Sequence, residues 1–466
     1  MRNTTRALLP ALLAALAAAP AAAQMTQPSV GSGTAQTGTE QAAATDSSQE
    51  ANRVVYAAAQ QIPIQHFRPV DKRGINVFES PKTDAVPYTG FKLMIGGAFA
   101  QDFQSIDHSN TAAPAMDGTV NKNQLANIGP GFNNSVANLH LAAQLARGIS
   151  VRMTTYLSSR HHNETWVKDG YLQIDSSPLD VPALNTLMRY ATIKFGQMEL
   201  NYGDSHFRRT DNGNALYNPF VGNLIMDAFT TEAGSEVYLQ HNGFLAMVGA
   251  SAGQVNPTVT NPQNRSPSFL GKVGFDRQVS DALRVRLTGS VYTNRHSTEQ
   301  NLFTGDRAGS RYFFVMENTT ATSKDNFRSG MLGPGMGYKM TSTVINPFVK
   351  FHGLELFGLA ERAKGRTRTE TVERTWNQYA VDATWRFLPG EPLYVAARYN
   401  TVSGPLTGTT NDVGASRWQM AAGWYITDNI LLKGEYITQR YNDYLPTHIL
   451  NGGKFRGLMI EGAVAF

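Results

Sequence analysis

The sequence contains no cysteine and few charged residues. Asp, Glu, Lys and Arg make up 17% of its 466 residues, below the roughly 25% usual in soluble domains. The absence of cysteine excludes a disulfide scaffold, a thiolate-bound metal and a thiol nucleophile. A net charge of +5 is too small to suggest a nucleic-acid partner. The mean hydropathy of −0.30 excludes a bundle of membrane helices, but it permits a β-barrel, whose strands are apolar only at alternate positions.

The N-terminus has the features of an export signal. Arg2 and Arg6 precede an Ala-rich apolar run over 7–23, which ends in a small-residue cleavage site. This order predicts a secretory signal peptide over 1–23. A membrane anchor is the alternative, but the run holds two prolines and barely reaches the roughly 17–25 residues that a span needs. We therefore expect the mature chain to work outside the cytoplasm.

From residue 91 to 466, apolar residues recur at every second position. Leu458, Ile460, Val464 and Phe466, for example, share one face of the last segment. A period of two is typical of β-strands. Most of the resulting spans are near the roughly 9–11 residues that a tilted strand needs to cross a bilayer. We predict sixteen strands, at 91–103, 135–146, 149–159, 165–175, 189–201, 233–241, 244–253, 267–277, 283–294, 341–351, 354–364, 376–387, 393–403, 416–426, 430–441 and 455–466.

The connections between these strands are sorted by length. Tight turns such as Asn242-Gly243 alternate with long loops, apart from one inverted pair at 160–164 and 176–188. Asn-Gly favours a hairpin because both positions accept positive φ. Tight turns at one end and long loops at the other are typical of an outer-membrane barrel. The predicted fold class is therefore all-β, a transmembrane antiparallel β-barrel with short periplasmic turns and long extracellular loops.

Two segments precede this barrel. Residues 24–52 are mainly Ala, Thr, Ser, Gly and Gln without an aromatic residue, which predicts a disordered low-complexity leader. Residues 53–90 carry scattered apolar side chains and four prolines, which argue against a long helix or a central strand. We expect them to form a short periplasmic segment or a partial plug.

The two faces of the strands differ in polarity. One is aliphatic and aromatic, as lipid contact requires, and the other is polar, as a water-filled lumen requires. A soluble sandwich would reverse the faces, but the export signal and the sorted loops favour the barrel. Inward basic residues outnumber inward acidic ones by nine to six, which predicts a mild anion preference. The basic residues predicted to line the pore include Arg152, Lys194, Arg284, Arg286, Lys350, Arg386, Arg398 and Lys433.

Aromatic residues are frequent near the predicted strand ends. Outer-membrane barrels carry such residues in girdles at both membrane interfaces. The predicted girdle residues include Phe91, Tyr190, Trp376, Tyr441 and Phe455.

The strand at 457–466 ends on Phe466, with apolar residues at alternate upstream positions. It resembles the terminal assembly signal of Gram-negative outer-membrane proteins, which implies that the barrel assembly machinery recognises Phe466. Sixteen strands and a 31-residue third long loop resemble the trimeric porins, in which that loop folds into the lumen. The segment 195–203, Phe-Gly-Gln-Met-Glu-Leu-Asn-Tyr-Gly, is similar to a passage of the phosphate-selective and dicarboxylate porins. The resemblance implies a homotrimer in the outer membrane of a Gram-negative bacterium, in contact with lipid and lipopolysaccharide.

The third long loop is the predicted pore constriction. A loop that bends into the lumen would present its charges to solutes, and the low-dielectric wall strengthens their field. An exposed loop with weak surface ion pairs is the alternative. The 46-residue connection after residue 294, with Arg307 and Arg311, is expected outside the barrel. The predicted constriction residues are Asp204, His206, Arg208, Arg209 and Asp211.

The motifs with catalytic or metal-binding letters lack the context that such chemistry needs. Residues 249–253 read Gly-Ala-Ser-Ala-Gly, but a nucleophile elbow requires a following helix. His161, His162 and Glu164 could hold a metal only in a tight loop, so a solvated loop is favoured. We therefore expect a porin for passive diffusion of small hydrophilic solutes, neither an enzyme nor dependent on a cofactor. A plugged transporter of hydrophobic or specific substrates, a barrel enzyme and a purely structural barrel are the alternatives.

Overall fold

The computed structural model describes residues 67–82, 86–159, 165–179, 181–256, 258–297, 302–305, 310–326 and 328–466. The predicted signal peptide, the predicted leader and residues 53–66 lie outside these ranges, as do His161, His162, Glu164 and Arg307. All described residues belong to one unit of the chain, 57–466. In the described part of the chain, no helix is both long and apolar enough to cross a membrane.

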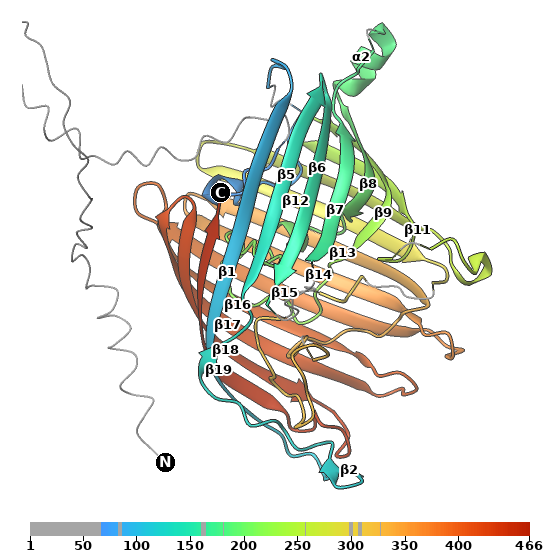
Figure 1. Cartoon of the computed structure of the whole chain (residues 1–466), viewed down its shortest axis with the longest axis vertical. Helices are drawn as coiled ribbons and strands as arrows, with labels where there is room; N and C mark the ends of the chain where they lie inside the picture. Colours follow the sequence, from blue (N-terminus) through green and yellow to red (C-terminus); the bar gives the residue numbers. More distant parts are fainter. Residues whose placement is uncertain are drawn as a thin grey trace, which may run out of the picture. The chain divides into compact units, whose positions relative to one another are not determined.

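These residues form a closed antiparallel barrel (Figure 1). The sheet has 17 strands, one of which, β4 (Gly131–Phe132), is a two-residue strand beside β1. The other sixteen make the wall, and β19 pairs with β1 to close it. They are β1 (Lys92–Ser109), β5 (Val136–Ala146), β6 (Ile149–Ser158), β7 (Thr165–Ile174), β8 (Ala191–Glu199), β9 (Thr231–His241), β10 (Phe244–Ser251), β11 (Ser268–Gln278), β12 (Leu283–Asn294), β13 (Lys339–Phe351), β14 (Leu354–Arg366), β15 (Arg374–Phe387), β16 (Leu393–Pro405), β17 (Asp412–Thr427), β18 (Ile430–Asn442) and β19 (Lys454–Ala465). The predicted fold class is confirmed.

The predicted strands match the observed ones, and the main differences lie at the end with the long loops. There β1 continues to Ser109 instead of residue 103, and β17 begins at Asp412 instead of residue 416. Both extensions are paired, β1 with β19 and β17 with β16. These two strands are therefore longer than the segments with alternating apolar residues from which they were predicted. A short hairpin of β2 (Met116–Asp117) and β3 (Val120–Asn121) extends the first loop.

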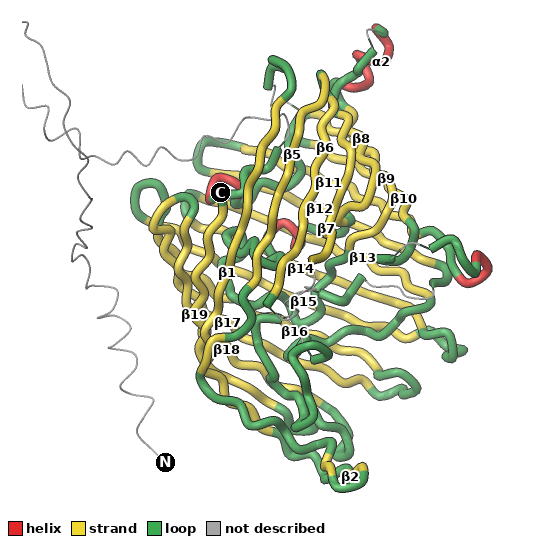
Figure 2. The backbone as a smooth tube through the Cα atoms, in the orientation of Figure 1, coloured by secondary structure: helices red, strands yellow, loops and turns green. Residues whose placement is uncertain are grey.

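The two connections that break the alternation of short turns and long loops do so in the structure as well. The connection between β7 and β8 lies at the end with the tight turns, although it is long enough to hold the helix α2 (Pro182–Met188). The helix projects beyond the barrel wall (Figure 2). Pro182 stands at its first position, where proline costs nothing because that N–H has no helical partner. Two single-turn 3-10 helices, η1 (Lys72–Gly74) and η2 (Ser205–Phe207), lie before β1 and between β8 and β9, and a third, η3 (Pro262–Asn264), follows β10.

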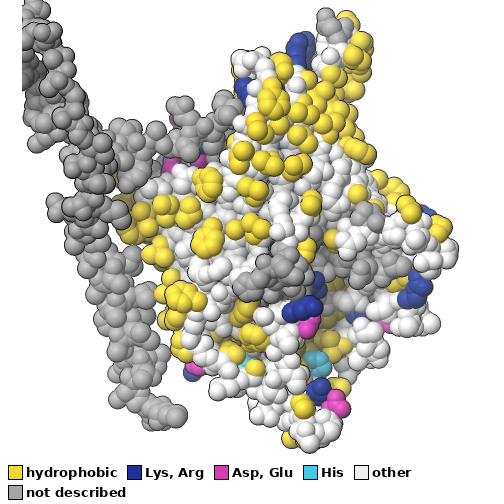
Figure 3. Space-filling model, viewed as in Figure 1, with side chains coloured by type: hydrophobic (Ala, Val, Ile, Leu, Met, Phe, Trp, Pro, Cys, Tyr) yellow, Lys and Arg dark blue, Asp and Glu magenta, His cyan; other side chains and the backbone are white. Residues whose placement is uncertain are grey.

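The outer surface is apolar and the interior is polar, as predicted. On the wall, Ile95, Val248 and Val381 are 62%, 65% and 61% exposed. On the face drawn in Figure 3, hydrophobic side chains spread over the strands. Inward neighbours such as Gln378 and Asp382 are buried. Because only lipid makes an apolar exterior favourable around a polar interior, the chain is a transmembrane barrel of the outer-membrane type.

The predicted aromatic girdle is wrong at three positions. Trp376, Tyr441 and Phe455 are 1%, 6% and 1% exposed and point into the lumen. The reason is strand parity, since Trp376 is an even number of residues from the inward-facing Gln378. Phe91 is 65% exposed, on the outer surface.

Candidate solute passage

The third long loop, residues 200–230, folds into the lumen, and we call it the lumen loop. It spans the barrel from β8 and β9 to the opposite wall. There the Ile225 N–H donates to Oδ1 of Asn400 on β16 across 2.7 Å. On β18, the buried ammonium of Lys433 donates to the carbonyl oxygen of Phe220 across 2.7 Å. Side chains of the wall therefore replace the backbone partners that a strand would have supplied.

Two of the predicted constriction residues hold the lumen loop in place. Asp204 is fully buried and accepts from Arg286 of β12 across 2.8 Å. Arg208 is 3% exposed and lies 3.3 Å from the carboxylate of Glu355 on β14. Each pair connects the loop to a different part of the wall. Such buried pairs are costly to break because the remaining charge is neither paired nor hydrated.

The other three predicted constriction residues border open space. His206 lies 3.1 Å from Glu199, and Asp211 lies 2.6 Å from the ammonium of Lys168. Arg209 is paired with Asp227 in its own loop, across 2.6 Å. The structure thus brings all five residues into the lumen, but only these three line the cavity described below.

A second segment enters the lumen, from the end with the tight turns. We call residues 67–82 the N-terminal segment. Its Lys72 N–H donates to the carbonyl oxygen of Asp428 in the last turn, across 2.8 Å. Its Arg68 donates to the carbonyl oxygen of Phe207 in the lumen loop, across 2.7 Å. The part of 53–90 that the structure describes here therefore contacts both the barrel and the lumen loop.

Described residues of the long connection between β12 and β13 also lie inside the barrel, contrary to the prediction. Arg311 is 5% exposed and lies 3.3 Å from Asp102 and 3.5 Å from Glu461. The hydroxyl of the neighbouring Tyr312 donates to Glu435 across 2.7 Å. The prediction failed because loop length alone does not reveal the buried carboxylates that receive such an arginine.

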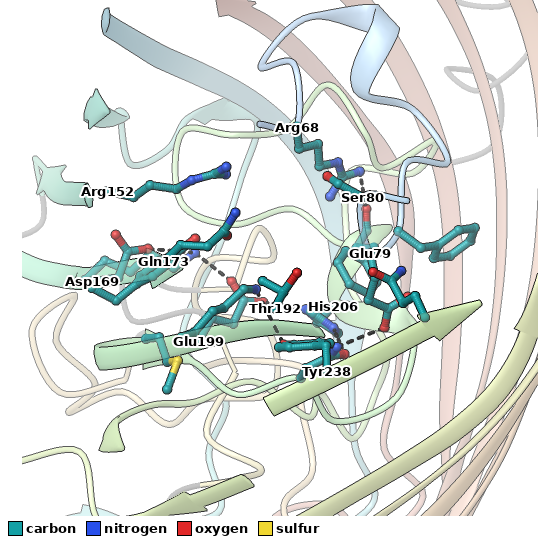
Figure 4. A pocket seen from close by; sticks show the side chains of 18 residues that line it. Arg68, Glu79, Ser80, Arg152, Asp169, Gln173, Thr192, Glu199, His206 and Tyr238 are labelled. Atoms are coloured by element: carbon teal, nitrogen blue, oxygen red, sulfur yellow. Dashed lines mark hydrogen bonds and ion pairs between the residues drawn. The ribbon is translucent and has the colours of Figure 1, made fainter. Parts of the chain in front are cut away.

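Between these three segments and the wall, space remains beside the strands that precede and follow the lumen loop. Two cavities, of about 230 and 180 Å³, lie between the N-terminal segment, the lumen loop and strands β5 to β9. Figure 4 shows the larger of these two. They are contiguous, since they share lining residues from the N-terminal segment, the lumen loop and strands β6 to β8, and we call them together the side passage. The shared residues are Arg68, Arg152, Lys168, Asp169, Tyr171, Glu199 and His206.

The predicted pore-lining cations fall into two groups. Arg152 and Lys194 border the side passage, and each lies against an aromatic ring: Arg152 is 4.7 Å from the ring of Phe67, and Lys194 is 4.8 Å from that of Tyr238. The remaining six form ion pairs across 2.7–2.9 Å: Arg284 with Asp276, Arg286 with Asp204, Lys350 with Glu391, Arg386 with Glu355, Arg398 with Asp382, and Lys433 with Glu461. Each of these six charges is therefore neutralised locally by a carboxylate partner.

Burial and neighbouring charges set the protonation of the groups inside the lumen. Burial alone would raise the pKa of Glu79 in the N-terminal segment, but Lys272 and Arg286 outweigh it and hold the pKa well below the usual 4.5. The same two cations lower the pKa of Asp204 against its own burial. Burial lowers the pKa of His206. The carboxylates are therefore charged and His206 is neutral at pH 7.

Solved outer-membrane porins are similar to this chain. An anion-selective porin from Comamonas acidovorans is 12% identical, with a TM-score of 0.48 over 81% of this chain and 100% of that one. The outer membrane channel DcaP of Acinetobacter baumannii is 10% identical, with a TM-score of 0.49 over 82% and 99%. OmpF of Salmonella typhi, in complex with daunomycin, is 12% identical, with a TM-score of 0.47 over 82% and 99%. Likeness of this degree concerns the fold alone. No protein-family model and no curated protein match the chain.

Sequence reasoning missed Arg68 and Lys168, both of which border the side passage. Arg68 stands in a proline-rich segment without periodicity, so nothing local places it in a lumen. Lys168 lies in a predicted strand and is buried there with Asp169 and Glu199 as ion-pair partners, but the alternation did not indicate this. A bulge between Thr154 and Thr155 shifts the register of β7 against β6, and this shift breaks the simple alternation.

Proposed function

We propose that the protein is an outer-membrane porin that lets small hydrophilic solutes diffuse passively through the side passage. The observation that carries this proposal is the side passage itself, a space inside the barrel that is lined by charged and polar side chains. Its lining of charged and hydroxyl groups suits water and polar solutes and disfavours hydrophobic ones. A diffusion channel needs no catalytic group, so an enzymatic role is not part of the proposal.

We further propose a mild preference for anions. Lys194 lies over the rings of Tyr171 and Tyr238, and Arg68 donates to the carbonyl oxygens of Gly74 and Phe207. Aromatic faces and carbonyl oxygens stabilise a cation without cancelling its charge. Acidic groups such as Glu199 and Asp169 also border the passage, which keeps the preference mild.

The predicted setting belongs to the same proposal. We infer a homotrimer surrounded by lipid and lipopolysaccharide, assembled by the barrel assembly machinery through Phe466. The Phe466 N–H donates to the carbonyl oxygen of Gly97 across 2.9 Å, and its ring is 57% exposed. An exposed terminal ring is accessible to a partner, which supports the assembly role.

The test is the reversal potential of single channels in a planar bilayer under a salt gradient. The wild type should conduct and favour anions mildly, and Lys194→Glu should move the reversal potential toward cation selectivity. Lys364→Glu is the matched control, because Lys364 is 57% exposed near the end of β14, where salt screens its charge. Equal shifts in both variants would contradict the assignment of selectivity to the side passage.

A further inference from the structure

The N-terminal segment separates the side passage from a second space. A cavity of about 810 Å³ lies at the end with the tight turns, bordered by residues of β9 to β12. Phe78 and Glu79 line this cavity and also the side passage, as does Gln240 of β9. These two residues of the segment therefore stand where a solute would cross from one space to the other.

Phe78 is held by aromatic and cationic contacts. Its ring lies 5.6 Å from that of Phe207 in the lumen loop and 5.4 Å from that of Phe348 on β13, edge to face. The guanidinium of Arg286 lies 4.2 Å from its centre. Phe78 is 3% exposed, so it is closely packed between loop and wall.

Glu79 is held by charge. Its carboxylate lies 2.8 Å from the ammonium of Lys272 on β11 and 2.7 Å from the guanidinium of Arg286 on β12. The amide of Asn201 in the lumen loop donates to it across 2.9 Å. Together with Phe78, Glu79 therefore connects the N-terminal segment to the barrel wall and to the lumen loop, both of which border the side passage.

A carboxylate of the lumen loop lies within reach of both cations besides Glu79. Asp204 lies 2.8 Å from Lys272 and 2.8 Å from Arg286. If the segment withdrew, each cation would keep a carboxylate partner. A buried charge left without any partner would oppose such a withdrawal more strongly, and the shared Asp204 lowers this cost.

We propose that the N-terminal segment is a gate that closes the side passage at its turn end, with Phe78 and Glu79 as the latch. When the latch is released, the side passage joins the 810 Å³ cavity and solutes cross more freely. This inference rests on the proposed function, because a gate matters only if the barrel conducts.

The test compares single-channel conductance of full-length variants that remain heat-modifiable, and therefore folded, on gels. Phe78→Ala combined with Glu79→Gln should conduct more than the wild type. Arg73→Gln is the control, because Arg73 is 52% exposed and pairs with Asp71 of its own segment; it should conduct like the wild type. If all three proteins conduct and conduct equally, the gate is overturned and the proposed function stands.

Deletion of residues 67–82 tests the gate where the double variant fails to assemble. The folded deletion variant should exceed the wild type in conductance by at least as much as the double variant. If it conducts no more than a conducting wild type, the gate is overturned. If neither the wild type nor the deletion variant conducts, the proposed function fails, which is a distinguishable result.

Discussion

Replacing Lys433 should weaken both the barrel and the anchoring of the lumen loop. Its ammonium is fully buried, lies 2.7 Å from Glu461 and donates to the carbonyl oxygens of Phe220 and Asn218 across 2.7 and 3.0 Å. Methionine has similar bulk but no charge. Removing one partner of a buried ion pair costs about 3–5 kcal/mol. Because Arg311 lies 3.5 Å from Glu461 and compensates part of the loss, we expect Lys433→Met to cost about 3 kcal/mol.

Urea unfolding in lipid vesicles, followed by tryptophan fluorescence, measures this cost. Lys364→Met is the control, because Lys364 is 57% exposed and 3.7 Å from its partner Glu373, so its loss should cost at most about 1 kcal/mol. Single-channel conductance of Lys433→Met should also become noisier, since part of the lumen loop is released. Equal unfolding midpoints for the two variants would refute the reasoning, and a destabilised variant with unchanged conductance would refute the anchoring role.

Two further predictions concern the outer surface and the latch. Val381→Arg, in the middle of β15 and on the lipid face, should cost about 2–4 kcal/mol. Val372→Arg, in the loop just before β15 where Val372 is 74% exposed, should cost little, and equal urea midpoints would place Val381 outside the lipid. Glu79 has a lowered pKa, so its ion pairs with Lys272 and Arg286 are complete above its usual pKa of 4.5 and are lost only as the pH falls below that value. Wild-type conductance should therefore stay constant between pH 7 and about 5 and rise only in stronger acid; a rise between pH 7 and 5 would contradict the latch.

The barrel could be predicted from the sequence because its signals are local. Apolar residues at every second position show which face of a strand is apolar, and dipeptides such as Asn242-Gly243 show where a hairpin turns. The structure places Asn242 at positive φ, as this turn requires. The same alternation places Trp376 on the inward face of its strand. The expectation of an aromatic girdle led to the opposite prediction.

The contents of the lumen could not be predicted because they depend on pairs far apart in the chain. Arg208 is 147 residues from Glu355, its partner on β14. Sequence reasoning treated Arg208 as a charge facing solutes, whereas the structure makes it an internal anchor. Nothing in a proline-rich, aperiodic stretch indicated that Phe78 would pack between the lumen loop and the wall. Such contacts can be predicted only after the closed barrel is known, because the barrel brings these distant residues together.

The side passage is the central claim, and one introduced cysteine tests it most directly. The chain has no cysteine of its own, so Lys194→Cys can be modified by a bulky water-soluble thiol reagent at a single site. Phe195→Cys is the control, because Phe195 is the next residue of β8, points outward and is 67% exposed on the lipid face. Modification at 194 should block most of the single-channel conductance, and treatment of the 195 variant should leave it unchanged. Full conductance of a channel that is completely modified at 194 would show that solutes do not cross through the side passage.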